Sequence, residues 1–505
     1  MFITTVKYGE LSSLKWVETP LTYYKPKVDA DLCTVCCASL NFLDIVAATG
    51  QLPLDYIPQY KNSNIYPGIE FAGYDSKGNR VMGITPHSSL ATHTMVELDY
   101  KIPVPKEWTI EQAATVPVAY ATCYYGLIIR GQMKRGESIL IHSGAGGVGL
   151  AAITLALSMD CELADNHIGN SRDTSFERMI MKETSGRGVD LVLNSLTGDK
   201  FQASFRCLAY NGRFIEIGKA DLVRNAELGM IEFLKNISVH AIFLNYFHED
   251  FLKKTGDGKR TMQLLKDGIA SGVVRPLPSS VFESHQLEQS FRHMTTGKHI
   301  GKVLVKVRDE KEHNVCKITS EVSEIYFDAH KSYIIIGGLG GFGLELANWM
   351  ITRGAKILIL TSNSGIRNGY QKLRLNYWKE NGISVIVSKE NCLTLCSTQN
   401  LINLANKSAP VGGIFHLALV LRDGNLVEQT KENFEEVCNS KYKTALNLDK
   451  VSREYCELLE YFVVFSSQLC GRGNAESSSY AMANSAMERI CEERKSEGFP
   501  AVSIS

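Results

Sequence analysis

The stretch "SILIHSGAGGVGLAAI", Ser138–Ile153, decides how the first half of the chain is interpreted. An apolar run leads into a glycine-rich turn and then into an alanine-rich segment, which predicts a strand, a tight turn and a helix. The turn contains Gly144, Gly146, Gly147 and Gly149. Glycines there permit the bend, let the backbone approach a pyrophosphate and let the helix pack on the strand, while the helix N-terminus attracts anions. The stretch therefore predicts a dinucleotide site.

A second turn of the same kind lies in "IIIGGLGGFG", Ile334–Gly343. Its glycines are Gly337, Gly338, Gly340, Gly341 and Gly343. It too follows an apolar strand and opens a leucine-rich helix, the context that supports a nucleotide site. Strands alternate with helices around both turns, which predicts an α/β fold with parallel sheets in each half of the chain.

Composition excludes several classes of protein. The chain has 505 residues, enough for two to four domains, with 54 basic and 54 acidic residues, which gives no support to nucleic acid or an anionic membrane as partner. No apolar run approaches the ~20 residues of a membrane helix. The 13 cysteines are scattered, which suits free thiols in a reducing compartment, the cytoplasm. "CTVCC" at Cys33–Cys37 has no nearby histidine pair, so no metal site is predicted.

The pattern divides the chain into five segments. They are a mostly β segment over 1–105, an alternating strand–helix segment over about 106–264, a closing helix and strand over about 265–307, a polar linker over 308–324, and a second α/β domain over 325–505.

Residues with chemical potential cluster near the end of the chain. "FVVFSSQLCGRGNAESSSYAMANSAMERI" places Ser467 and Tyr480 thirteen residues apart and Asn484 one helical turn after Tyr480, with Lys441 upstream. This set resembles the short-chain dehydrogenase/reductase superfamily. The upstream lysine, with asparagine four residues after the tyrosine, resembles the β-ketoacyl reductase of animal fatty acid synthases and reducing polyketide synthases.

That resemblance implies a role for each residue. Tyr480 would protonate the substrate carbonyl, Ser467 would orient the carbonyl oxygen, and Lys441 would assist the tyrosine while binding the nicotinamide ribose. The physical reason is that a phenol with pKa ~10 is a poor proton donor at neutral pH unless a nearby ammonium favours its ionisation. Asn484 takes the place where most members of the superfamily have the lysine.

The first domain resembles the enoyl reductase of animal fatty acid synthase, a zinc-free medium-chain reductase. The motifs include "PGIEFAGYDSKGNRVMG", "ATVPVAYATCYYGL", "GVDLVLNSL" and "RFIEIGKADL". The resemblance covers residues 1–307 and implies NADPH-dependent reduction of trans-2-enoyl thioesters, with Lys219 as a proton donor. The family's second candidate donor, an aspartate, corresponds to Asn245, whose amide cannot supply that proton.

The two resemblances together imply a setting. Enoyl reductase followed by ketoreductase is the order in the synthase, so the expected substrates are acyl thioesters carried on the phosphopantetheine of an acyl carrier protein. A homodimer within a larger synthase is expected. The ketoreductase is expected to be truncated at its C-terminus, and the chain to be a fragment or an incomplete gene product.

Three features depart from the family. In "LALSMDCELADNHIGNSRDTSFERM", Leu155–Met179, roughly 20 residues are missing after Cys161, the length of a βα unit that would make the second strand and seat the adenosine. Asn363 replaces an arginine that would hold the NADPH 2′-phosphate, and Arg367 is the candidate substitute. Asn245 is the third.

Three hypotheses remain open on the sequence. The first is a two-reductase segment of a fatty acid synthase, with the ketoreductase the more competent half. The second is a non-catalytic paralogue that keeps the fold as a scaffold, favoured by Asn245, Asn363 and the missing unit. The third is the reducing module of a polyketide synthase, which product length and branching would distinguish.

Overall fold

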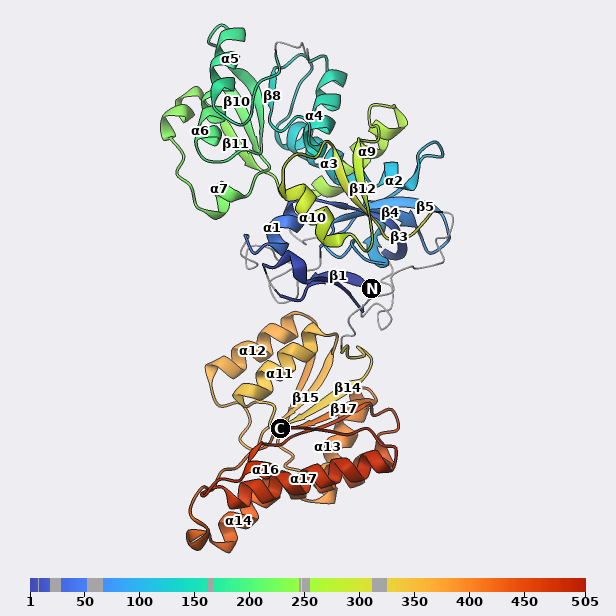
Figure 1. Ribbon diagram of the computed structural model, residues 1–505, viewed down its shortest axis with the longest axis vertical. Coiled ribbons are helices and arrows are strands. Elements are labelled where there is room, and N and C mark those ends of the chain that lie inside the picture. Colours follow the sequence, from blue (N-terminus) through green and yellow to red (C-terminus); the bar gives the residue numbers. More distant parts are fainter. Residues whose placement is uncertain are drawn as a thin grey trace. The chain divides into compact units, whose positions relative to one another are not determined.

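The computed structural model describes residues 1–7, 9–18, 29–51, 67–161, 167–244, 247, 255–310 and 325–505. The chain forms two compact units, one made by the described residues up to 310 and the other by residues 325–505 (Figure 1). Asn245 and residues 311–324 of the predicted linker lie outside the described residues.

The first unit contains a sheet in the order β12-β13-β3-β4-β5-β7, with β6 also paired to β3. Most of its pairs are antiparallel. Its strands are β3 (Ala30–Leu40), β4 (Glu70–Tyr74), β5 (Arg80–Ile84), β6 (His93–Glu97), β7 (Lys101–Pro103), β12 (Ser279–Glu283) and β13 (Lys302–Lys306). A separate two-stranded sheet pairs β1 (Phe2–Thr5) with β2 (Leu14–Val17).

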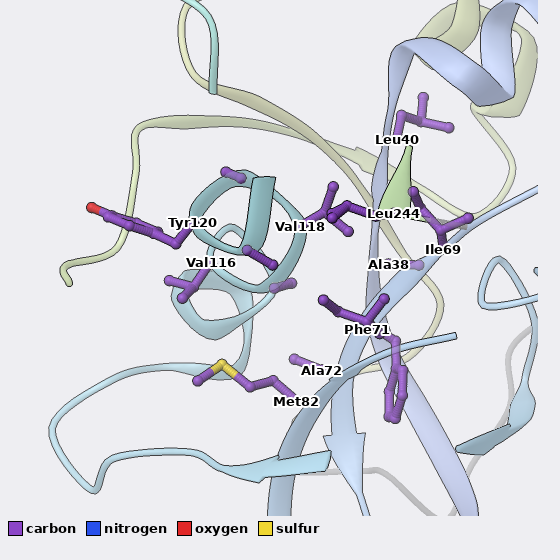
Figure 2. Close-up of a cluster of buried hydrophobic side chains, with 14 of the residues drawn as sticks. Ala38, Leu40, Ile69, Phe71, Ala72, Met82, Val116, Val118, Tyr120 and Leu244 are labelled. Atoms are coloured by element: carbon purple, nitrogen blue, oxygen red, sulfur yellow. The ribbon is translucent and has the colours of Figure 1, made fainter. Parts of the chain in front are cut away.

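The core of this part lies where a buried helix meets the sheet. Helix α3 (Pro117–Cys123) is buried along its whole length, so it is apolar on every face. Figure 2 shows Val116 and Val118 gathered with side chains of the sheet such as Ala38 and Phe71. Other helices of this unit are α1 (Phe42–Ala48), α2 (Ile110–Ala113), α9 (Asp257–Ala270) and α10 (Leu287–Thr295).

A parallel four-stranded sheet completes the first unit, in the order β11-β10-β9-β8. Its elements are β8 (Ile139–Ile141), α4 (Gly147–Ser158), α5 (Ser175–Glu183), β9 (Val189–Asn194), α6 (Asp199–Arg206), β10 (Leu208–Glu216), α7 (Ala220–Val223) and β11 (Ser238–Ala241). Within the described residues, β8 pairs with β9 on one side and with no strand on the other. This is the place where the sequence predicts the missing strand.

The second unit is built on six parallel strands in the order β16-β15-β14-β17-β18-β19. They are β14 (Ser332–Ile336), β15 (Ile357–Thr361), β16 (Ser384–Ser388), β17 (Val411–His416), β18 (Tyr461–Phe465) and β19 (Val502–Ile504). Its helices are α11 (Gly341–Thr352), α12 (Gly369–Glu380), α13 (Leu395–Ser408), α14 (Lys431–Cys438), α15 (Thr444–Tyr455), α16 (Leu469–Arg472) and α17 (Ser478–Ser496).

Helices cover both faces of that sheet (Figure 1). Successive residues of a strand point to opposite faces, so Ile334 and Ile336 join one core and Tyr333 and Ile335 the other. Every residue of β14 is buried, as expected for the central strand of a doubly wound sheet. Among the described helices of the chain, none combines the length and hydropathy of a membrane span.

Candidate active sites

The second glycine turn joins β14 to α11. Gly337 has φ +79°, a conformation that glycine adopts without strain. A Cβ on Gly343 would lie 2.7 Å from the Gly337 carbonyl oxygen, so this glycine lets helix and strand pack closely. A Cβ on Gly341 would meet nothing within 4 Å, which leaves open space at the start of the helix. Gly340 is the residue before the helix, and its lack of a side chain leaves the first helical N–H groups available to an anion.

Lys441 lies inside the second unit, on a π-helical turn (Asn439–Lys443) between α14 and α15. Such turns are frequent at functional sites because they redirect a side chain. Only 3% of Lys441 is exposed, and its Nζ donates a hydrogen bond of 2.8 Å to the carbonyl oxygen of Phe465 at the end of β18. Burial lowers the pKa of Lys441 to about 8, with a smaller opposing effect from Cys470.

Tyr480 and Asn484 lie on α17 beside this lysine. The Lys441 Nζ is 5.3 Å from the centroid of the Tyr480 ring, and Asn484 Nδ2 donates to the Tyr480 carbonyl oxygen at 2.9 Å. Ser467 follows β18 by two residues, so it comes from the strand end that Lys441 contacts. The structure thus brings together Lys441, Tyr480 and Asn484, with Ser467 at the adjoining strand end.

His416, which the sequence analysis did not single out, fixes the backbone of Lys441. It ends β17 and is buried, and its Nε2 donates to the Lys441 carbonyl oxygen at 3.0 Å. Burial lowers the pKa of His416 to about 4, so the ring is neutral at physiological pH. Its signal was a histidine closing the apolar run "GGIF", which is weak without knowledge of the neighbouring helix.

These residues fit a dinucleotide. The Oδ1 of Asn484 is buried and has no partner within the described residues, although a buried acceptor is normally satisfied. The open space at Gly341, this acceptor and the Lys441 ammonium lie at the carboxyl ends of parallel strands, where such sheets bind nucleotides. Asn363 and Arg367 are both exposed in the loop after β15, so the predicted substitute cation lies on the same loop as the residue it would replace.

The glycine turn of the first unit has the same local form. It joins β8 to α4, and a Cβ on Gly149 would collide with the Ser143 carbonyl, as at Gly343. Gly146 stands before the helix, as Gly340 does. Gly144 would tolerate a Cβ, whereas one on Gly147 would lie 2.6 Å from Cδ of Lys302.

Lys302, on β13, belongs to a buried polar cluster that links this turn to the mostly antiparallel sheet. Its Nζ is 2.7 Å from Oε1 of Glu70 and 2.9 Å from Oδ1 of Asn41. The backbone N–H of Gly301 also donates to the Ala145 carbonyl in the turn, at 2.8 Å. The turn is therefore held against β13.

Lys219 lies just beyond β10. Its Nζ donates to the carbonyl oxygens of Ile217 and Ile242, at 3.1 and 2.5 Å. Burial lowers its pKa to about 8, and the nearby Glu216 carboxylate opposes that shift. Sequence reasoning missed Glu216, which is 4% exposed, and burial raises its pKa to about 7 against hydrogen bonds from Asn194 and Gly218. The only signal in the sequence was an acidic residue directly after the apolar residues Phe214 and Ile215.

The first unit fits a dinucleotide only in part. Its turn can accept a pyrophosphate, but the described residues provide no strand beyond β8 whose end could hold the adenosine ribose. No group of three or more histidine, cysteine or acidic residues in the described part is placed to hold a metal.

Fold and sites define the class. The first unit has a zinc-free medium-chain reductase fold, and the second is a Rossmann domain of the short-chain type with a lysine, tyrosine and asparagine set. Residues 331–505 match the KR domain family and residues 164–305 the family described as zinc-binding dehydrogenase. Both domains are of NADPH-dependent oxidoreductase types.

Particular relatives sharpen this. The chain is 31% identical to a highly reducing polyketide synthase of Cordyceps militaris, over 98% of this chain and 20% of that protein. It is 32% identical to another from Aureobasidium melanogenum, over 100% and 23%. The crystal structure of CurK enoyl reductase matches with TM-score 0.54 and 30% identity, over 60% of this chain and 98% of that chain.

The chain therefore carries an enoyl reductase-type and a ketoreductase-type domain and is similar along nearly its whole length to part of these synthases, of whose length it spans about a fifth. The expectation of an animal fatty acid synthase is not supported, because these relatives are fungal highly reducing polyketide synthases. Motifs common to both kinds of synthase carried that expectation.

Proposed function

We propose that this chain is the reducing segment of a polyketide-type synthase. Its second unit reduces 3-ketoacyl thioesters to 3-hydroxyacyl thioesters with NADPH. The observation that carries this proposal is the buried Lys441, which lies 5.3 Å from the Tyr480 ring at the carboxyl end of the sheet. A buried ammonium beside a phenol is the arrangement that proton transfer to a carbonyl requires.

The residues act on the substrate oxygen. NADPH, when bound, supplies the hydride for the carbonyl carbon. Tyr480 donates the proton that the carbonyl oxygen needs, and Ser467 orients that oxygen from the end of β18. Lys441 stabilises the phenolate left behind and is itself fixed by the Phe465 carbonyl and by His416. Asn484 offers its unpartnered Oδ1 to the ribose or to a water that resupplies the proton.

The first unit has a candidate proton donor for enoyl reduction but only part of a cofactor site. Lys219 is half-buried and positioned by two carbonyls, as a proton donor would be. The described residues lack the strand that would seat the adenosine, so they do not complete a site for the hydride donor. The first unit then serves as a scaffold, which keeps the non-catalytic alternative open for this half of the chain.

The similarity to large synthases supports a proposal for the natural setting. The acyl groups would arrive on phosphopantetheine of an acyl carrier protein, within a larger synthase that we propose to be a homodimer. The assignment to a reducing polyketide synthase rather than to a fatty acid synthase rests on these relatives. Every described cysteine is a free thiol, which supports a cytoplasmic location.

The test uses the purified chain, a 3-ketoacyl thioester and, separately, a trans-2-enoyl thioester, with NADPH oxidation as the readout. Tyr480→Phe is expected to lower ketoacyl turnover by about 10²–10⁴-fold, the usual contribution of an acid–base group. Tyr455→Phe, at a partly exposed position in the same unit, is the control. Turnover that survives Tyr480→Phe would refute the assignment. No turnover of either substrate by a folded chain would favour the scaffold hypothesis.

A further inference from the structure

The ends of β15 and β16 lie side by side in the second unit. Thr361 pairs with Ser388 at the last position of the two strands, and the N–H of Ser362 donates to the Ser388 carbonyl at 3.0 Å. The loop from β15 to α12 therefore begins next to Lys389, the first residue after β16.

The side chain of Lys389 lies over that loop. A Cβ built on Gly365 would be 3.3 Å from Cε of Lys389, so the lysine stem passes across the glycine backbone, where φ is +67°. Lys389 is exposed, and within the described residues no hydrogen bond or ion pair engages its ammonium. The carboxylate of the adjacent Glu390 is engaged elsewhere: its Oε2 accepts from Ser397 Oγ at 2.6 Å, at the start of α13, and no ion pair joins it to Lys389 within the described residues.

The loop itself carries one cation and no acid. Its sequence, "SNSGIRNGYQ" over 362–371, includes Arg367, which is exposed. The loop is tied to the glycine turn through Gln371, whose Oε1 accepts from the Arg367 N–H at 2.6 Å and whose Nε2 donates to the Leu339 carbonyl at 2.9 Å. The spacing between the loop and the phosphate-binding turn is therefore fixed.

The position of this loop defines the ligand group that it would meet. In a doubly wound sheet the dinucleotide lies across the carboxyl ends of the strands, with the adenosine ribose at the end of the strand that follows the glycine turn. That strand is β15 here. NADPH carries a phosphate on the 2′-oxygen of that ribose and NADH carries a hydroxyl, so cations at this point favour NADPH.

We propose that Lys389, together with Arg367, binds the 2′-phosphate of NADPH and gives the ketoreductase its preference for NADPH over NADH. The cation comes from the end of β16, the strand paired with β15, and not from position 363, where Asn363 is uncharged. This inference rests on the proposed function, because it takes the second unit to be the dinucleotide-binding ketoreductase.

The test measures dissociation constants of NADPH and NADH for the whole chain by nicotinamide fluorescence titration. Lys389→Gln is expected to weaken NADPH binding about tenfold, the scale of one charge-assisted contact, and to leave NADH binding unchanged. Lys389→Arg keeps the cation and is expected to keep the preference. Lys379→Gln removes another exposed cation, from the far end of α12, and is the control. Gly340→Asp shows which part of the fluorescence signal comes from the second unit. In this variant the new carboxylate competes with the pyrophosphate for the N–H groups at the start of α11, so the signal of that unit is lost.

Added salt gives a second readout. Screening weakens an exposed ion pair, so the NADPH:NADH preference should fall with ionic strength in the wild type and change less in Lys389→Gln. An unchanged preference in Lys389→Gln would overturn the inference, as would an equal loss for NADH. Failure of the proposed function looks different: the chain would bind NADPH with the expected lysine dependence and yet reduce no 3-ketoacyl thioester.

Discussion

The two nucleotide-type sheets of this chain share a turn and differ in what stands beside it. In the second unit, β14 lies between β15 and β17, so the glycine turn is flanked on both sides. In the first unit, β8 has β9 on one side and, within the described residues, no strand on the other. In both turns the helix packs closely on the strand because a glycine, Gly149 or Gly343, faces the turn. A Cβ at either position would collide with a carbonyl oxygen of the turn.

The difference separates two requirements of dinucleotide binding. The turn and the helix N-terminus bind the pyrophosphate, and they depend on local sequence alone. The adenosine half needs the end of the next strand, which is set by the sheet order and not by the turn. A glycine motif therefore predicts the pyrophosphate site but not the adenosine site. The first unit shows whether the pyrophosphate site alone is sufficient to bind the dinucleotide.

A matched pair of substitutions gives the largest expected contrast. Gly340→Asp and Gly146→Asp each place a carboxylate before a helix, at positions with φ −66° and −78° that any residue adopts. The Cβ distances to the nearest carbonyl oxygen, 3.2 and 3.3 Å, are equally tight. Aspartate caps the helix and occupies the N–H groups that the pyrophosphate needs. We expect Gly340→Asp to weaken NADPH binding of the chain by about 100-fold, because the new carboxylate and the pyrophosphate are both negative and repel each other at the helix start.

Gly146→Asp should leave NADPH binding almost unchanged, because the first unit contributes little to it. Fluorescence titration measures both variants, and circular dichroism checks that each remains folded. A large loss from Gly146→Asp would break the comparison and show that the first unit seats its cofactor without the missing strand.

The sequence predicted most of this contrast, for physical reasons that differ between its parts. Glycine spacing after an apolar run is a local signal, so both turns were found. The gap after Cys161 was visible because a βα unit needs a minimum length. The contact of His416 and the proposed role of Lys389 were not predicted, because both depend on neighbouring elements that are distant in sequence. The kind of synthase was misjudged because catalytic motifs record the chemistry of a site and not the protein around it.

Backbone exposure provides the next contrast. Ser138 and His142 bond to β9, so the alternate residues Ile139 and Ile141 point their amides to the open edge. We expect hydrogen–deuterium exchange over residues 138–142 to be about tenfold faster than over β14, because edge amides exchange through local opening. Strand β10, which has neighbours on both sides, is the control within the first unit. Equal protection of β8 and β14 would mean that another segment or another copy covers the edge.

The smallest expected effect concerns the pH dependence of the candidate ketoreductase site in the second unit. Burial lowers the pKa of Lys441 from 10.5 to about 8, so the ammonium is lost as the pH rises through that value. For 3-ketoacyl reduction, kcat/KM reports protonation changes of the free enzyme. Its value should have fallen about twofold when the pH reaches the pKa of this group. Lys441→Arg keeps its charge at high pH. We expect this variant to be slower and to lack this limb of the profile.

Unfolding of the protein at high pH would not produce the same limb. Between pH 8 and 10.5 the unfolded chain binds more protons at this lysine than the folded chain does. The contribution of Lys441 to the free energy of unfolding therefore increases as the pH rises. A decline in activity while thermal stability holds or increases would assign the limb to the loss of the cation beside Tyr480, and an identical limb in Lys441→Arg would assign it elsewhere.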